Sequence, residues 1–273
     1  MLINKKGDAF ALGIVIVTII VCGVMLYSLN TSSTILKTSV TSQVAINQFY
    51  DRQIKFEYYT KEAAKMSEQQ ALYESAKKGG VLEGACKPLK AGQDYVVIWD
   101  NNCNPVTGDT INSLFSKYFN ESFATFIMNY PDYDLNITNL SVLMSDDYAN
   151  LNFDNMTFIK YVENGAVSYS ADYTFNPSFS YKMELGPKTF KDIYHLVNYQ
   201  LDDCKKESSD INHLAPCLNK LIVKNMWKTM ASRDGNYLLL NMTTTKKFFF
   251  YDSDSWEFKW QPIELRFAIP IVI

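Results

Sequence analysis

The stretch from Lys5 to Leu29 reads KKGDAFALGIVIVTIIVCGVMLYSL, and its last 21 residues, Ala9 to Leu29, carry no charge. A helix over Ala9–Leu29 would be roughly 30 Å long, which is enough to cross the hydrocarbon core of a bilayer. A removable secretory peptide has a shorter apolar core and ends in small residues, which Met25–Leu29 does not offer. Two lysines precede the run, so the positive-inside rule keeps the short N-terminus in the cytoplasm. We therefore expect a single-pass membrane anchor through Ala9–Leu29, with everything after it outside the cell membrane.

The helical character is expected to continue well beyond the apolar run. The sequence holds no glycine or proline between Gly23 and Gly79, and helices in globular proteins average only about 11–12 residues. Lys77-Lys78-Gly79-Gly80 is a strong stop signal, whereas the capping residues of 30–34 favour a kink. We expect one long helix over about 8–78. This divides the chain into a cytoplasmic leader (1–7), a transmembrane or assembly helix (8–30), a helical stalk or spine (31–79) and an extracytoplasmic domain (80–273).

The expected domain mixes helices and strands, so the predicted fold class is α+β. Helices are predicted over 110–131, from Thr189, and from Asp210 through Leu221 and Ile222, where apolar residues recur every three or four positions. Strands of an antiparallel β-sheet are predicted where short apolar runs alternate with turn residues, and the sheet closes with a buried C-terminal strand. The predicted strands are Tyr95–Trp99, Ile137–Leu143, Met156–Val162, Val167–Phe175, Phe179–Leu185, Tyr237–Leu240, Lys247–Tyr251, Trp256–Trp260 and Ile263–Ile273, with a turn at Asp252–Ser255.

Four of the five cysteines lie after the apolar run, in two close pairs. An even number of cysteines in an exported domain predicts disulfides. Three connectivities are possible, and we predict that neighbours pair, Cys86 with Cys103 and Cys204 with Cys217. A zinc site is the alternative, but neither a CxxC spacing nor a nearby histidine pair supports it.

The exported part is also rich in Asn-x-Ser/Thr triplets, which are acceptors for N-glycosylation. If they are used, most of them should lie on exposed surface. The six predicted sites are Asn30, Asn120, Asn136, Asn139, Asn155 and Asn241.

The sequence offers no catalytic motif, and we expect neither enzyme activity nor a cofactor. GxSxG, HExxH, P-loop, GxGxxG and EF-hand patterns are missing from it. Its two histidines, His195 and His213, are each expected to be structural or surface residues. The carboxylate clusters Asp146-Asp147 and Asp252-Ser253-Asp254 are expected to be solvated turns, with weak calcium binding as the alternative. A net charge of −3 and the lack of a basic stripe argue against nucleic acid as a partner.

Aromatic residues gather near the C-terminus, in Phe248–Tyr251 and at Trp256, Phe258 and Trp260. Strand alternation places the last three on one side of a hairpin. We expect them to pack in the core, and stacking on sugars is the alternative.

The four residues Lys6-Gly7-Asp8-Ala9, directly before the apolar helix, resemble the class III signal peptide of archaeal type IV pilin-like proteins. The resemblance covers about the first 30 residues and the long-helix layout. It implies cleavage between Gly7 and Asp8 by a prepilin-type peptidase, with Ala9–Leu29 retained as the helix that assembles with copies of the chain or other pilin-like subunits. Leu12 stands where many bacterial pilins have a glutamate at the fifth mature position.

Together these observations predict a membrane-anchored cell-surface protein that resembles a type IV pilin. The expected role is structural or adhesive, as a filament subunit or a minor pilin. The alternative is a single-pass, anchored binding module for a glycan, a peptide or a protein partner. It shares the anchor but needs neither cleavage nor assembly.

Overall fold

The computed structural model describes residues 35–271 except for 83, 92–93, 108–109, 132–134, 138, 165–166, 208–209 and 224–225. The chain divides into two units, Met1–Phe56 and Glu57–Ile273, and the boundary falls inside helix α2 (Ile35–Lys77). Within the described residues, no helix combines the length and the apolar character needed to span a bilayer. The expected membrane helix Ala9–Leu29 and the expected cleavage site at Gly7 and Asp8 lie outside the described residues and stay predictions.

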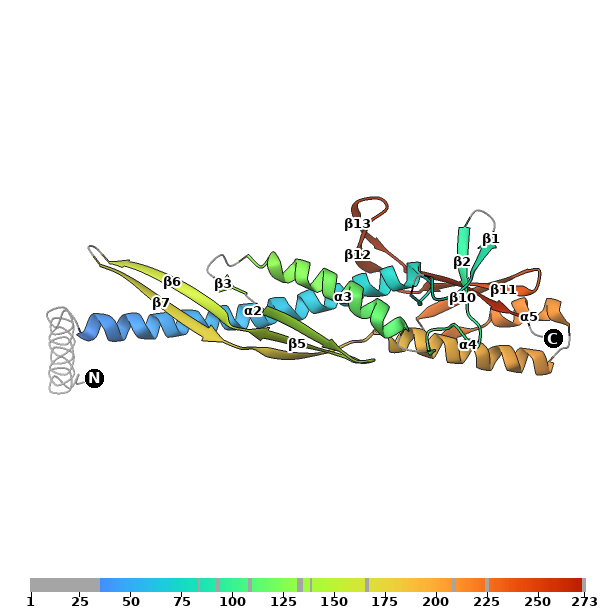
Figure 1. The fold of residues 1–273 in the computed structure, drawn as a ribbon, viewed down its shortest axis with the longest axis horizontal. Helices are drawn as coiled ribbons and strands as arrows, with labels where there is room; N and C mark the ends of the chain where they lie inside the picture. The colour runs from blue at the N-terminus through green and yellow to red at the C-terminus, as the bar shows by residue number, and fades with distance from the viewer. Residues whose placement is uncertain are drawn as a thin grey trace, which may run out of the picture. The chain divides into compact units, whose positions relative to one another are not determined.

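Helix α2 ends where the sequence predicts, at Lys77 (Figure 1). Small side chains line its packed side in the second unit, and each is at most 5% exposed: Ala63, Ala64, Ala71 and Ala76. Gly79 and Gly80 follow with φ values of 72° and 71°, which only glycine adopts freely. The Gly80 N–H donates to the carbonyl of Ser75 at 2.8 Å, as in a Schellman cap. A Cβ on Gly80 would lie 2.8 Å from the ring of Phe190 in helix α4 (Lys188–Glu207), so glycine also permits this close approach.

The largest sheet has six strands in the order β1-β2-β14-β11-β10-β9. Its strands are β1 (Pro88–Ala91), β2 (Asp94–Ile98), β9 (Ile222–Val223), β10 (Trp227–Asp234), β11 (Tyr237–Thr244) and β14 (Glu264–Pro270). Alternate residues of the central strands point into the core; Trp227, Leu240, Leu265 and Phe267 are at most 2% exposed. Trp99 stacks on Phe267 with ring centroids 3.6 Å apart and meets Tyr194 of α4 edge-on at 5.9 Å, so α4 covers this face.

The rest of the described β-structure consists of one two-stranded hairpin and two three-stranded sheets. One has the order β4-β5-β8, with β4 (Asn139–Met144), β5 (Tyr148–Asp154) and β8 (Ser178–Lys182), and the other has the order β3-β6-β7, with β3 (Leu135–Asn136), β6 (Met156–Asn164) and β7 (Val167–Phe175). The first is tied to α2 by Glu68, which is 3% exposed. This carboxylate accepts hydrogen bonds from the Tyr181 hydroxyl and the Leu185 backbone N–H, each at 2.5 Å.

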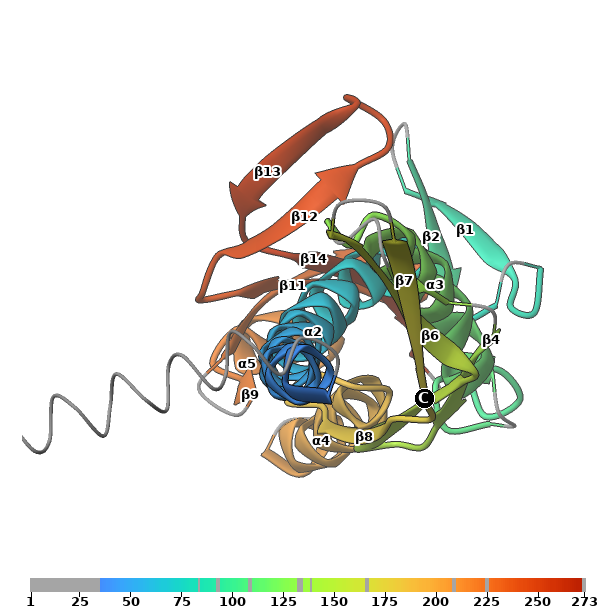
Figure 2. The same ribbon diagram turned by 90° about the vertical axis from the view of Figure 1, so that its left-hand side faces the viewer.

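Helix α3 (Thr110–Met128) lies beside the second-unit part of α2, and the Tyr59 hydroxyl donates to the carbonyl of Phe126 at 2.7 Å (Figure 2). Its buried residues recur at helical spacing: Ile111, Leu114, Phe115, Phe119, Phe123 and Ile127. Helix α5 (Ile211–Leu218) starts at the predicted cap, because the Asp210 carboxylate accepts from the N–H of Asn212 at 2.9 Å.

Both predicted disulfides are confirmed. Cys86 pairs with Cys103 across a Cα–Cα distance of 5.4 Å, and Cys204 pairs with Cys217 across 6.0 Å. The second bridge ties α4 to α5, as expected for a hairpin of two helices. The described part of the chain is therefore α+β with mainly antiparallel sheets, as predicted. Two disulfides, each closing a short loop, cross-link it.

The structure also differs from the predictions in several places. Strands β1, β5 and β10 were not predicted, because β1 has only four residues and the asparagines in β5 and the small or polar residues in β10 weaken the apolar alternation. Leu221 and Ile222 were expected in the helix from Asp210, but α5 ends at Leu218 and Ile222 starts β9. Finally, β14 pairs with β2 in parallel, with Phe267 opposite Val97, which local sequence does not reveal.

Candidate functional site: an exposed aromatic hairpin

The aromatic C-terminal segment forms a separate two-stranded hairpin, β12 (Phe248–Asp252) and β13 (Glu257–Gln261) (Figure 1). Its turn lies at the predicted place. The Trp256 N–H donates to the carbonyl of Asp252 at 2.9 Å. Trp256 has a φ of 60°, an uncommon left-handed conformation for a bulky residue. The register sets Phe249 opposite Trp260 and Tyr251 opposite Phe258.

One face of the hairpin is fastened to α2 through a stacked pair and a buried carboxylate. The ring of Phe250, which is 1% exposed, stacks on Tyr73 with centroids 3.9 Å apart. Asp252 is 6% exposed and accepts hydrogen bonds from the Tyr73 hydroxyl (2.8 Å), the Ser255 hydroxyl (2.9 Å) and the Lys259 ammonium (2.5 Å). The Lys259 ammonium, with the Tyr73 hydroxyl, holds the pKa of Asp252 well below its usual range. Burial, with Asp252 beside it, raises the pKa of Tyr73.

The outer edge of β12 is closed by two side-chain amides of α2. The Gln69 Oε1 accepts from the N–H of Phe249 at 3.0 Å. Gln70 exchanges two bonds with Tyr251, accepting from its N–H at 2.7 Å and donating to its carbonyl at 2.9 Å. These amides take the place that a neighbouring strand would occupy, so this edge has no room for a further strand.

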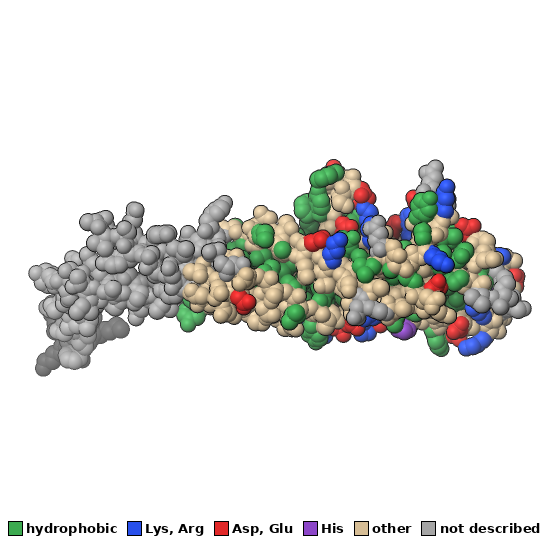
Figure 3. Space-filling view, in the orientation of Figure 1, with side chains coloured by type: hydrophobic (Ala, Val, Ile, Leu, Met, Phe, Trp, Pro, Cys, Tyr) green, Lys and Arg blue, Asp and Glu red, His purple; other side chains and the backbone are tan. Residues whose placement is uncertain are grey.

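The opposite face of the hairpin carries four aromatic side chains, Phe249, Tyr251, Phe258 and Trp260, and the turn adds the exposed Trp256. Trp256 is 80% exposed, Phe258 58% and Trp260 63%. The rings of Phe249 and Phe258 lie parallel with centroids 5.3 Å apart, and Tyr251 meets Phe258 edge-on at 5.3 Å. The space-filling view shows hydrophobic side chains gathered on this projecting hairpin (Figure 3). We call these five residues the aromatic face.

The expectation that Trp256, Phe258 and Trp260 pack in the core is wrong. The hairpin has aromatic residues on both faces, and Phe250 on the other face already occupies the contact with α2. Single exposed apolar residues are ordinary in soluble proteins, but a contiguous exposed apolar patch marks an interaction site. The signal was present in the sequence, because Phe248–Tyr251 is aromatic at every position and a strand with one buried face alternates.

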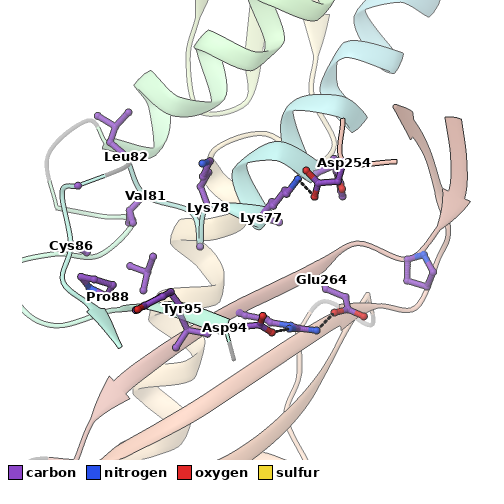
Figure 4. A pocket seen from close by; sticks show the side chains of 18 of the residues that line it. Lys77, Lys78, Val81, Leu82, Cys86, Pro88, Asp94, Tyr95, Asp254 and Glu264 are labelled. Atoms are coloured by element: carbon purple, nitrogen blue, oxygen red, sulfur yellow. Dashed lines mark hydrogen bonds and ion pairs between the residues drawn. The ribbon is translucent and has the colours of Figure 1, made fainter. Parts of the chain in front are cut away.

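A cavity of about 880 Å³ lies next to the hairpin turn, bordered by the end of α2, β1, β2 and β14 (Figure 4). Two groups of paired charges line it. Lys77 bonds Asp254 at 2.5 Å, and Arg266 bonds Asp94 at 3.1 Å and Glu264 at 2.9 Å. The cavity is large enough for a small solute. Lys78 also lines the cavity, so three basic and three acidic side chains border it and it does not select one sign of ligand.

The two histidines lie on different helices, His195 on α4 and His213 on α5. His195 is exposed on α4. The His213 Nε2 lies 3.7 Å from a Glu207 carboxylate oxygen, and the Sγ of Cys217 completes a cluster whose ligand-type atoms lie within 4.8 Å. Cys217 is held in a disulfide, so it has no thiolate to offer a metal.

The carboxylate clusters fall into different environments. Asp146 is partly exposed and pairs with Lys191 at 2.7 Å, and Asp254 is 71% exposed. Asp252, in contrast, is buried and saturated with donors, so the expectation of a solvated turn is wrong for it. Its oxygens are committed to holding the hairpin.

The predicted glycosylation sites also differ from one another. Asn139 at the start of β4 and Asn155 in the β5–β6 turn are exposed, as expected. Asn120 on α3 and Asn241 within β11 are only partly exposed, and their amide oxygens are buried. The side chain of Asn136 is not described, and Asn30 lies outside the described residues.

Comparisons with protein-family models, with curated proteins and with solved structures each returned no match.

Proposed function

We propose that the chain is a membrane-anchored cell-surface protein of the pilin-like kind, with an adhesive role carried by its aromatic face. Export across the cell membrane would place the α+β domain outside, where its two disulfides are stable. The N-terminal anchor rests on the sequence of Ala9–Leu29 and on the motif around Gly7 and Asp8.

The observation that carries the adhesive role is the contrast between the two faces of the hairpin. One face is held to α2 by a stacked ring pair and a buried carboxylate, while the other leaves Trp256, Phe258 and Trp260 between 58% and 80% exposed. Aromatic side chains supply large contact areas with little conformational freedom to lose, and they are enriched in interfaces. A rigid support under an exposed aromatic surface suits contact with a partner.

Two measurements on cells that carry the full-length chain test this proposal. N-terminal sequencing of the surface protein should find Asp8 first, and electron microscopy with a labelled antibody should place the chain on filaments. If the chain keeps Met1 and occurs only in membranes, the proposed anchor stands and the proposed filament role is ruled out.

The aromatic face is tested by the double variant Phe258→Ser and Trp260→Ser. Cell clumping and attachment to polystyrene should fall at least fivefold, with the amount of surface protein unchanged. Met230→Ser on β10 is the matched control, because Met230 is 70% exposed but lies away from the hairpin. Equal loss in the control would contradict a specific role of the aromatic face.

The binding-module alternative uses the same surface with a foreign ligand. Specific retention on a glycan array that disappears in the double variant would favour it over self-assembly.

A further inference from the structure

The hairpin has one closed edge and one open edge. Gln69 and Gln70 bond the backbone of β12 at Phe249 and Tyr251. The N–H groups of Phe249 and Tyr251 therefore point away from β13, and the pairs that these residues form with β13 are of the non-hydrogen-bonded kind. It follows that their partners, Trp260 and Phe258, direct their own N–H and C=O groups to the outer edge of β13.

That outer edge has no partner within the described residues. β13 belongs to a two-stranded sheet whose other member is β12, and β13 is the outer of the two strands relative to α2 (Figure 2). An exposed edge is a template for another strand, and like charges brought opposite each other or a proline within the paired stretch would oppose that pairing. β13 carries one residue of each charge, Glu257 and Lys259, and Pro262 lies just beyond its end. In β13, the edge-facing backbone groups belong to two exposed aromatic residues, Phe258 and Trp260.

We propose that β13 pairs antiparallel with β13 of a second copy of the chain, about a two-fold axis at Phe258. This deepens the proposed function, on which it rests, by naming the partner of the aromatic face. The pairing joins two hairpins into one four-stranded sheet. Because the axis is perpendicular to the sheet, the aromatic faces of both copies lie on the same side and become continuous.

Charge complementarity favours this register over two-fold pairings centred on the next residues of β13. A centre at Phe258 sets Glu257 of each copy opposite Lys259 of the other, and opposite charges in facing positions stabilise a sheet. A centre at Lys259 sets the two lysines directly opposite each other, which is unfavourable. A centre at Trp260 sets Phe258 opposite Pro262, which has no N–H to donate.

The contact is small, since β13 has five residues. Stable interfaces between proteins in solution bury roughly 1,200–2,000 Å² in total, so pairing of two such strands should be weak in dilute solution. Copies anchored in one membrane or packed along one filament are held at high effective concentration, at which weak contacts form.

Disulfide trapping in the full-length chain tests the register. All variants carry Cys22→Ala, so that only the introduced thiol reacts, and are oxidised mildly in native membranes. A hydrogen-bonded antiparallel pair has a Cα–Cα distance of about 5.5 Å, inside the range for a disulfide. Phe258→Cys should therefore give a covalent dimer as the main product. Met230→Cys, an equally exposed strand position, should give at least tenfold less.

Two further arms make the outcome decisive. Glu257→Lys in the Phe258→Cys chain should lower the dimer fraction at least fivefold, because the new lysine lies opposite Lys259 of the other copy and the two like charges repel. A mixture of Phe258→Cys and Trp260→Cys chains that forms only the mixed dimer would overturn the register, since it requires a centre at Lys259.

Absence of any Phe258→Cys dimer would overturn the strand pairing itself. If the Phe258→Ser and Trp260→Ser variant nevertheless lost adhesion, the aromatic face would keep its role with a different partner. If it also lost no adhesion, the proposed function would fail as well.

Discussion

Replacing Asp252 by asparagine should undock the aromatic hairpin without changing the shape of any side chain. The carboxylate is 6% exposed and joins Tyr73 of α2 to Ser255 and Lys259 of the hairpin. Asparagine keeps one acceptor oxygen, which can still serve the Tyr73 hydroxyl. Its amide nitrogen then faces the Lys259 ammonium, and two donors cannot bond each other.

The expected loss follows from these contacts. A hydrogen bond to a charged group contributes about 1.5–3 kcal/mol, and Asp252→Asn removes the bond to Lys259 and turns the bond from Tyr73 into a neutral one. The side chain of Lys259 is 31% exposed, so water recovers part of its solvation. We expect a loss of about 2–3 kcal/mol in the free energy of hairpin docking. Asp254→Asn removes only an exposed ion pair with Lys77 and should cost less than about 0.5 kcal/mol.

The assay is amide hydrogen exchange at Phe250 and Tyr251, with tryptophan fluorescence during urea titration, on the full-length protein in detergent. The native pKa of Asp252 is lowered. The contribution of the Asp252 carboxylate to stability is therefore complete above the pKa of about 3.9 that it has in the unfolded chain, and it is lost as the pH falls through its pKa in the folded protein. The difference between parent and variant should be constant from about pH 5 to 8 and shrink in stronger acid. Equal effects of Asp252→Asn and Asp254→Asn, or a difference that grows in acid, would show that the Asp252 carboxylate does not hold the hairpin.

Two further perturbations test the packing around α2. Gly80→Ala should cost about 2–4 kcal/mol, because it adds a clash with Phe190 to the strain of a positive φ. Gly84→Ala, at φ 80° with no atom within 4 Å of its Cβ, should cost only about 1 kcal/mol; equal costs in urea unfolding would show that the clash is relieved. Burial raises the pKa of Glu68, so its contribution to stability is complete below about pH 4.3 and is lost as the pH rises through the native value. Glu68→Gln should remove this loss, so the variant should become more stable relative to the parent as the pH rises. Stability curves of variant and parent that stay parallel from pH 4 to 8 would contradict a raised pKa of Glu68.

Local sequence predicted the features that depend on neighbours along the chain. The absence of glycine and proline up to Lys78, followed by two glycines, indicated where α2 ends. Asp210 marked a helix start because an N-cap acts over only two or three residues. Short spacing likewise paired the cysteines correctly, since a short loop brings its two ends together at low entropic cost.

Local sequence did not reveal which side of the aromatic hairpin would be buried. Both faces of the hairpin carry aromatic residues, so alternation alone does not predict which face is buried. The contact of Phe250 with Tyr73, 177 residues earlier in the chain, decides it. The same long-range docking turns Asp252 from an ordinary turn residue into a buried anchor.

Local sequence was thus enough to predict the α+β class, the end of α2, the start of α5 and the disulfide pairs. Each follows from periodicity, capping or spacing within a few turns of chain. The parallel pairing of β2 with β14, the closed edge of β12, the open edge of β13 and the exposure of the aromatic face became known only from the three-dimensional structure. These features depend on contacts between segments far apart in the sequence, whose free energies no local pattern encodes.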